Sequence, residues 1–253
     1  MPAGGKSRVR AVFVDMEQIY TIPVNEKFEA SAADHSLGCP FCALYNMLEE
    51  DELGLILGAS MMEPDIRIKT NELGFCKTHF DMMFERKNRL PLALMLESHL
   101  GEVEKSVAGG GMSNLLNPGG ETLKSLSKLE SSCYVCGRIE HNFRMMVETA
   151  VLLWEKDEEF RAKTAAQPFF CLPHYRLFLE VAKERIQKKR FSDFYKTVSE
   201  LEHKYVEELC GDVSWFCKKF DYRYNEEPWY NAKDSVPRAL AFLSGHIHLP
   251  PEK

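Results

Sequence analysis

The stretch Cys39-Pro-Phe-Cys42, followed after 33 residues by Cys76-Lys-Thr-His79, decides the fold of this chain. The pattern returns 94 residues later as Cys133-Tyr-Val-Cys136, followed after 34 residues by Cys171-Leu-Pro-His174. In both copies an aromatic residue precedes the third cysteine and another follows the histidine. Four residue types in the same order, with spacers that match to one residue, indicate an internal duplication.

The spacing within each motif is typical of metal ligands. Two residues between ligands let a tight turn aim both side chains at one ion, and two such turns supply the four tetrahedral positions that zinc prefers. We therefore predict two structural zinc ions per chain, one in each copy. The predicted ligands are Cys39, Cys42, Cys76 and His79 in the first copy and Cys133, Cys136, Cys171 and His174 in the second. An iron–sulfur cluster and thiol redox chemistry of the C-x-x-C pairs are the alternatives.

Apolar residues recur at three- and four-residue intervals after each motif, which predicts helices and places every motif at or just before a helix start. Helices are expected over residues 41–57, 77–87 and 92–107 of the first copy and over 139–154, 178–186 and 191–209 of the second. The fold class is therefore mainly α, with two tandem metal-pinned helical units and little or no β structure. The only candidate strands are short ones near Val12–Val14 or Tyr20–Val24.

Composition along the chain suggests five parts. We expect an N-terminal extension over residues 1–19, a first metal-binding helical repeat over 20–107, a Gly-rich linker over 108–131, a second metal-binding repeat over 132–219 and an aromatic C-terminal tail over 220–253. In the tail, Asp234 or Ser235 is placed to cap a last helix that ends at Gly245.

The segment from Ser60 to Asn71 differs most between the copies and is expected to be a loop. Its polar residues and methionines make it a candidate ligand site near the first metal ion, and the second copy has no counterpart in register. The candidate residues are Met61, Met62, Glu63, Asp65, Arg67 and Asn71. The alternative is a loop held by an internal acidic residue paired with arginine and by a cap on the next helix.

Several other residues are given structural roles. His99 falls on the apolar side of its helix and is expected to be buried and hydrogen-bonded. Cys210 and Cys217 are expected to be small buried apolar residues, and the aromatic residues near Trp215 and Trp229 to be core or docking residues. No spacing predicts a partner for His141, His203, His246 or His248.

Composition excludes several classes of protein. A chain of 253 residues with 45% hydrophobic and 28% charged residues is typical of a globular protein, and no apolar stretch is long enough to span a bilayer. The start of the sequence has no secretory pattern, so we expect a cytoplasmic protein, in which regularly spaced cysteines are more often metal ligands than disulfides. No common catalytic motif is present, and we predict no enzymatic activity.

The net charge of −6 argues against a general nucleic-acid-binding protein. The one basic run, Lys183–Arg190, is interpreted as the solvated face of a helix. We therefore expect a zinc-binding protein that acts by binding a protein or small-molecule partner. The alternatives are an iron–sulfur or thiol redox protein or sensor and, with less support, a nucleic-acid-binding zinc protein that uses the basic run.

Four segments of the sequence carry a family resemblance. They are IYTIPVNEKF, CPFCALYNMLEEDELGLILGASMMEPDIRIKTNELGFCKTHF, NRLPLALMLESHL and WFCKKFDYRYNEEPWYNAKDSVPRAL. They resemble an uncharacterised family of bacterial proteins, found mainly in clostridia and related Firmicutes and classed as a domain of unknown function. The resemblance runs from about Tyr20 to Ser244. It implies an intracellular bacterial protein and assigns no catalytic residue.

Overall fold

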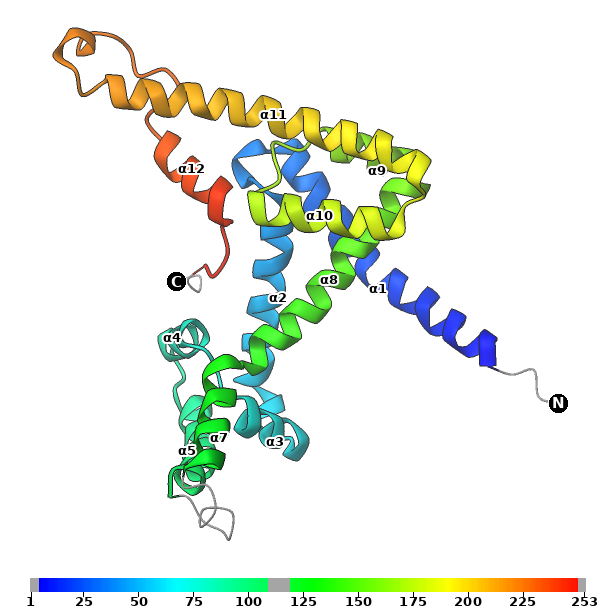
Figure 1. Ribbon diagram of the computed structural model, residues 1–253, viewed down its shortest axis with the longest axis vertical. Helices are drawn as coiled ribbons and strands as arrows, with labels where there is room; N and C mark the ends of the chain where they lie inside the picture. Colours follow the sequence, from blue (N-terminus) through cyan, green and yellow to red (C-terminus); the bar gives the residue numbers. More distant parts are fainter. Residues whose placement is uncertain (1–4, 109–118, 250–253) are drawn as a thin grey trace. The chain divides into compact units, whose positions relative to one another are not determined.

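The computed structural model describes residues 5–108 and 119–249, where all the regular structure is helical (Figure 1). The mainly α fold that the apolar periodicity predicts is confirmed. The α-helices are α1 (Gly5–Ala33), α2 (Pro40–Ile56), α3 (Pro64–Leu73), α4 (Lys77–Glu85), α5 (Leu90–Ala108), α7 (Gly120–Ser131), α8 (Tyr134–Lys156), α9 (Glu158–Ala165), α10 (Leu172–Arg185), α11 (Lys188–Lys218) and α12 (Ser235–Ser244). Short 3₁₀ turns lie at His35–Leu37 (η1), Ala59–Met62 (η2) and Tyr222–Tyr224 (η3).

The candidate strands near the N-terminus are wrong, because both stretches lie inside α1. The run Thr21–Val24 has the β-branched composition of a strand. Its packing follows helical spacing instead: Val24 and Phe28, four residues apart, are both completely buried. Tertiary burial of one helical face therefore overrides the local β preference.

The expected loop from Ser60 to Asn71 is also wrong, since η2 and α3 occupy it. Pro64 is the first residue of α3, a position where its missing N–H and its fixed φ favour a helix start. Helix α9 begins at the equivalent position of the second copy, 94 residues on. The two copies thus share this helix although their residues differ. The difference expected between the two segments is therefore one of side chains and not of backbone structure.

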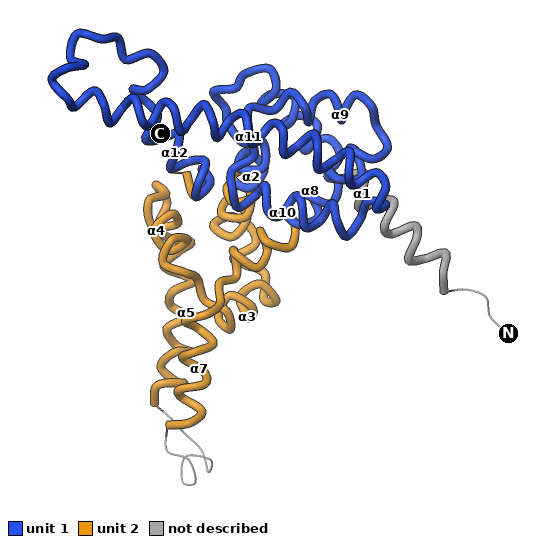
Figure 2. Tube along the Cα trace, turned by 45° about the horizontal axis from the view of Figure 1, so that its top comes forward, with its two compact units in different colours: residues 1–45, 143–247 blue, residues 46–142, 248–253 orange. Residues whose placement is uncertain are grey.

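Contacts along the chain divide it into two compact units, coloured separately in Figure 2. Unit 1 takes its described residues from 1–45 and 143–247, and unit 2 takes them from 46–142 and 248–253. Helices α2 and α8 each contribute residues to both units. Each unit therefore combines segments from both copies of the repeat.

Unit 1 is organised around aromatic side chains. Helices α10, α11 and α12 pack against one another, and α9 lies against α1 and α11. The rings at the centre are completely buried and meet mostly in edge-to-face or tilted arrangements, which aromatic pairs prefer. They are Phe28, Phe41, Phe160, Phe170, Phe178 and Phe194.

Unit 2 has an aliphatic core with an ion pair at its edge. Helices α3, α5 and α7 pack together, and Leu53, Met83 and Ile139 are completely buried. Arg138 of α8 donates to Glu52 of α2, with 2.8 Å between Nη2 and Oε1. Because the Glu52 side chain is only 7% exposed, this pair ties the two helices together at the edge of the core.

Three smaller expectations can be compared with the structure. His99 is half-buried and its Nδ1 lies 3.2 Å from the Asn71 carbonyl oxygen, so the hydrogen bond is present but the burial is partial. Cys210 and Cys217 are exposed, not buried, and they lie beyond Leu209, the last buried residue of α11. Asp234 is the N-cap of α12, and Gly245, with φ of 83°, ends the helix.

Candidate metal centres

The eight predicted ligands form two clusters, but the clusters pair across the copies. Centre 1 consists of Cys39, Cys42, Cys171 and His174, all in unit 1. Centre 2 consists of Cys76, His79, Cys133 and Cys136, all in unit 2. Each copy gives its C-x-x-C motif to one centre and its C-x-x-H motif to the other. The expectation of one self-contained centre in each copy is therefore wrong.

The length of α2, the helix that begins at the first C-x-x-C motif, explains why the motifs pair across the two copies. Helix α2 has 17 residues, and at 1.5 Å per residue it carries the chain about 25 Å away from its first turn. The C-x-x-H motif that follows meets α2 well past that first turn: His79 contacts Glu49, seven residues beyond Cys42. Ligand spacing along the chain contains no information about this displacement.

All four motifs lie at helix starts, as their spacing predicts. Cys39 and Cys133 immediately precede α2 and α8, and Cys76 and Cys171 are the N-caps of α4 and α10. Each centre thus receives two helix N-termini, whose partial positive charge favours the thiolate form of cysteine.

The spacing within centre 1 matches a tetrahedron around one ion. With metal–sulfur bonds of 2.3 Å and metal–nitrogen bonds near 2.0 Å, the edges of such a tetrahedron are about 3.8 Å and about 3.5 Å. Cys42 Sγ lies 3.5 Å from both Cys171 Sγ and His174 Nδ1. Cys39 Sγ lies 3.7 Å from the same nitrogen. The three sulfurs and Nδ1 therefore converge on one point.

Centre 2 has the same geometry. Cys133 Sγ and Cys136 Sγ each lie 3.4 Å from His79 Nδ1, and Cys76 Sγ lies 3.8 Å from Cys136 Sγ. In both centres the histidine presents Nδ1, which leaves Nε2 to face other residues. The thiols differ in exposure: the cysteines of centre 1 are buried, and those of centre 2 are only half-buried.

The thiols within each cluster cannot all ionise without a cation. Hydrogen bonds from Cys171 and Cys39 hold the pKa of Cys42 far below its usual range, while burial raises the pKa of Cys39. In centre 2, a hydrogen bond from Cys136 lowers the pKa of Cys133 to about 3, and the same contact raises the pKa of Cys136. Ionisation of one thiol in each cluster thus disfavours ionisation of its neighbour, and a bound cation would remove this conflict by balancing the charge of several thiolates.

The rings of the two histidines have different neighbours. His79 Nε2 lies 3.1 Å from Oε1 of the buried Glu49, a carboxylate–histidine contact that is common behind metal ligands. His174 lies instead against aromatic rings, 4.9 Å from Phe143 between centroids. Glu49 and Phe143 are 94 residues apart and occupy equivalent positions of the repeat.

Residues near the C-terminus also contact the centres. The backbone N–H of His246 donates to Cys42 Sγ over 3.3 Å, and His248 Nδ1 lies 2.5 Å from Glu49 Oε1. Sequence reasoning did not predict the roles of Glu49 and His248. Alignment of the two copies would have shown that Glu49 replaces an aromatic residue, but no local signal points to His248.

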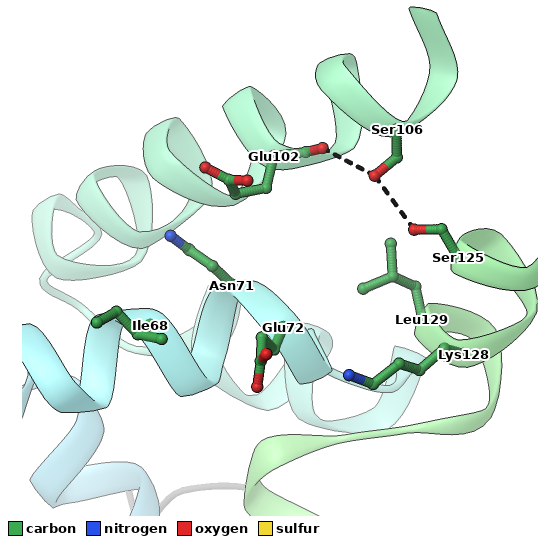
Figure 3. Close-up of a pocket in the computed structure, with 8 residues that line it drawn as sticks. All are labelled: Ile68, Asn71, Glu72, Glu102, Ser106, Ser125, Lys128 and Leu129. Carbon is green, nitrogen blue, oxygen red and sulfur yellow. Dashed lines mark hydrogen bonds between the residues drawn. The ribbon is translucent and has the colours of Figure 1, made fainter. Parts of the chain in front are cut away.

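The candidate ligand residues of the first copy do not converge. Arg67 donates to the Leu94 carbonyl oxygen over 2.6 Å, which holds α3 to α5. Met62, Glu63 and Asp65 are exposed. Only Asn71 lines a pocket, of about 390 Å³, between α3, α5 and α7 (Figure 3).

A larger cleft, of about 950 Å³, lies in unit 1 and reaches centre 1. Cys39 and Cys42 form part of its wall. The rest is amphipathic, with Phe169 stacked on Tyr205 at 4.2 Å between ring centroids. Charged side chains of both signs line it as well: Glu200, Lys204, Glu208, Asp234 and Arg238.

Among the described residues, no helix is both long and apolar enough to cross a membrane. No curated protein and no solved structure matches the chain. A protein-family model matches residues 16–250, nearly the whole chain, including both Cys/His clusters. The chain belongs to this family, which is described as a family of unknown function, DUF6062.

Proposed function

We propose that both centres hold structural zinc and that the protein is a zinc-stabilised helical scaffold that binds a partner molecule in a reducing compartment such as the cytoplasm. One observation carries the proposal: in each cluster, three sulfurs and one imidazole nitrogen lie within 4.8 Å of one another. Thiolate and imidazole are the ligands that zinc prefers in structural sites.

The ligand sets favour a single zinc ion over an iron–sulfur cluster. In a cluster the cysteines bind different iron atoms, so their sulfurs must be spaced more widely than around one ion. In centre 1 the sulfurs of Cys42 and Cys171 lie 3.5 Å apart, which fits a shared ion. Four protein ligands also close the coordination sphere and leave no position for a substrate, which favours a structural over a catalytic metal.

Each zinc ion would join segments that are distant in sequence. Centre 1 links Cys42 to Cys171 across 129 residues, and centre 2 links Cys76 to Cys136 across 60. Because the unfolded chain does not hold such ligands together, the binding energy of the metal becomes folding energy. The protein should therefore depend on zinc for its helical structure.

The binding role rests on the cleft in unit 1. Its volume of about 950 Å³ is in the range of small-molecule sites, and it combines stacked aromatic rings with charged side chains. Its contact with Cys39 and Cys42 means that loss of zinc from centre 1 would disturb the wall of the cleft.

The experiment is elemental analysis of purified protein with circular dichroism before and after chelation. We expect two zinc ions per chain and a loss of helicity when they are removed. Cys42→Ser should lower the stoichiometry to one, whereas Cys210→Ser, at an exposed cysteine of α11 outside both centres, should leave it at two. Iron with sulfide in place of zinc, or helicity that survives chelation, would contradict the proposal.

A further inference from the structure

Glu49 lies at the junction between a metal ligand and the C-terminal segment. It is 1% exposed, and its Oε1 accepts hydrogen bonds from His79 Nε2 over 3.1 Å and from His248 Nδ1 over 2.5 Å. The two imidazole rings are nearly perpendicular, with 5.9 Å between their centroids. All three residues belong to unit 2.

Each of these three residues depends on a hydrogen bond to its neighbour. With Nδ1 directed at the metal position, His79 carries its proton on Nε2 and donates it to Glu49. A buried carboxylate is costly unless donors surround it. His248 supplies a second N–H, and its side chain, 34% exposed, lies between Glu49 and solvent.

Centre 1 lacks this arrangement. At the repeat position equivalent to Glu49 it has Phe143, whose ring packs against His174. Rings from Phe41 and Phe143 hold that histidine without a carboxylate. The two centres therefore have the same four ligands and different surroundings.

Centre 2 is also the more accessible of the two. Its three cysteines are half-buried, whereas Cys39, Cys42 and Cys171 of centre 1 are at most 4% exposed. A chelator or an acceptor protein that competes for the metal can approach half-buried sulfurs more easily. Retention of a metal ion in centre 2 therefore depends more than in centre 1 on how firmly the ligand side chains are held in place.

We infer that Glu49 and His248 are positioning residues that retain the metal ion in centre 2. The contact between His248 and Glu49 controls how fast zinc leaves this centre. The zinc ion in centre 1 stays bound and does not depend on this contact. The inference rests on the proposed zinc binding. It assigns to the C-terminal segment a role in controlling metal release, and it predicts that the exchange partner is a thiol-rich or chelating acceptor of zinc.

The test is release of zinc from the full-length, zinc-loaded protein into an excess of a colorimetric chelator. The wild-type protein should release one zinc quickly from centre 2 and one slowly from centre 1. His248→Ala should speed the fast phase about 10- to 100-fold, the usual effect of removing a residue that supports a ligand. The slow phase should not change.

The matched control is His203→Ala. This histidine is exposed on α11 and belongs to neither centre and not to the lining of the cleft. Both phases should stay within about twofold of the wild type. Glu49→Gln keeps the shape of the side chain and removes its charge, and it should also accelerate only the fast phase.

Cadmium NMR gives a second measurement that does not depend on rates. Each loaded centre should give one resonance, and His248→Ala should move only that of centre 2. Unchanged release in His248→Ala, or equal acceleration of both phases, would overturn the inference while leaving the proposed function intact. Protein that binds no zinc at all would instead overturn the proposed function.

Discussion

Glu202 of α11 is buried beside the second C-x-x-H motif and differs from the other buried glutamates. Its Oε1 accepts a hydrogen bond from the Phe170 backbone N–H over 2.5 Å. Its Oε2 is buried and has no hydrogen-bond partner among the described residues. Burial outweighs the Phe170 contact and raises the pKa of Glu202 to about 8. The protonated form is therefore the one that the folded protein accommodates.

This raised pKa makes stability fall as the pH rises. Between the unfolded pKa, near 4.5, and the folded value of about 8, the folded protein binds a proton that the unfolded chain does not. The contribution of Glu202 is therefore complete below about pH 4.5 and is lost as the pH approaches 8. We expect Glu202→Gln, which stays neutral and can still accept from Phe170, to be more stable than the wild type at pH 9 by up to about 2 kcal/mol.

Thermal unfolding at pH 6 and pH 9, with zinc in excess, measures this difference. The gap in Tm between Glu202→Gln and the wild type should widen by a few degrees from the lower to the higher pH. Glu200→Gln, two residues away at an exposed position, is the control and should show no such widening. A constant gap would mean that Glu202 is already ionised at pH 6.

At the residue scale, the sequence was sufficient to find the clustered cysteines and histidines and insufficient to find what surrounds them. Spacing and residue type identified all eight clustered side chains, because a tetrahedral site imposes a local rule on the chain. Glu49 and His248 follow no such rule. They are 199 residues apart, and only the folded chain brings them together.

Among the elements, the turn after α11 is held by one buried lysine. Lys219 is 7% exposed, and its Nζ donates to the carbonyl oxygens of Tyr224, Asn225 and Glu227 over 2.6, 2.9 and 2.6 Å. The same ammonium lies 5.4 Å from the centroid of the Trp229 ring. One side chain thus satisfies three backbone acceptors that belong to no helix ladder.

We predict that Lys219→Met loosens this turn without affecting the metal. Methionine keeps most of the apolar stem but removes the three Lys219 hydrogen bonds, and of the three carbonyl groups only that of Tyr224 keeps another donor among the described residues, the Glu227 N–H. Hydrogen bonds to a charged group contribute about 1.5–3 kcal/mol each. Limited proteolysis within residues 220–231 should become about tenfold faster or more, and the zinc content should not change. The neighbouring Lys218→Met, at an exposed position, should behave as the wild type. Cleavage at the wild-type rate in Lys219→Met would contradict the prediction.

The helices were predicted correctly where the apolar periodicity is strong, and one was missed where the periodicity is weak. Long amphipathic stretches such as α8 and the first two thirds of α11, up to Leu209, follow from the sequence because one face meets the core there. Helix α3 is short and largely exposed, with Thr70 its only buried residue, so it offers little periodicity. Its polar residues therefore resembled those of a loop.

At the scale of the whole molecule, the two centres are nested along the chain. The outermost motifs form centre 1 and the inner two form centre 2. Ligand order alone is equally compatible with sequential pairing, which is why the crossed arrangement was not predicted. The nested order means that neither copy of the repeat holds a complete native centre.

Fragments provide a direct test. We expect residues 1–118 and residues 119–253, expressed separately, to lack native helicity, because each carries one half of both centres. Mixed with zinc, they should associate one to one, bind two ions and recover the helicity of the intact protein. Fragments that each bind one zinc, keep their helicity and remain apart would show that the sequential pairing is correct.

The crossed ligands also have a consequence for the order of synthesis. On the ribosome Cys39, Cys42, Cys76 and His79 emerge as a complete set of four, 57 residues (136 − 79) before Cys136 completes the ligands of centre 2. At about 5–20 residues per second, this set exists alone for roughly 3–11 s. A zinc ion captured in that interval would join two motifs that belong to different centres. Zinc captured at this stage would have to leave these four ligands before either native centre could form, because each native centre takes only two of them.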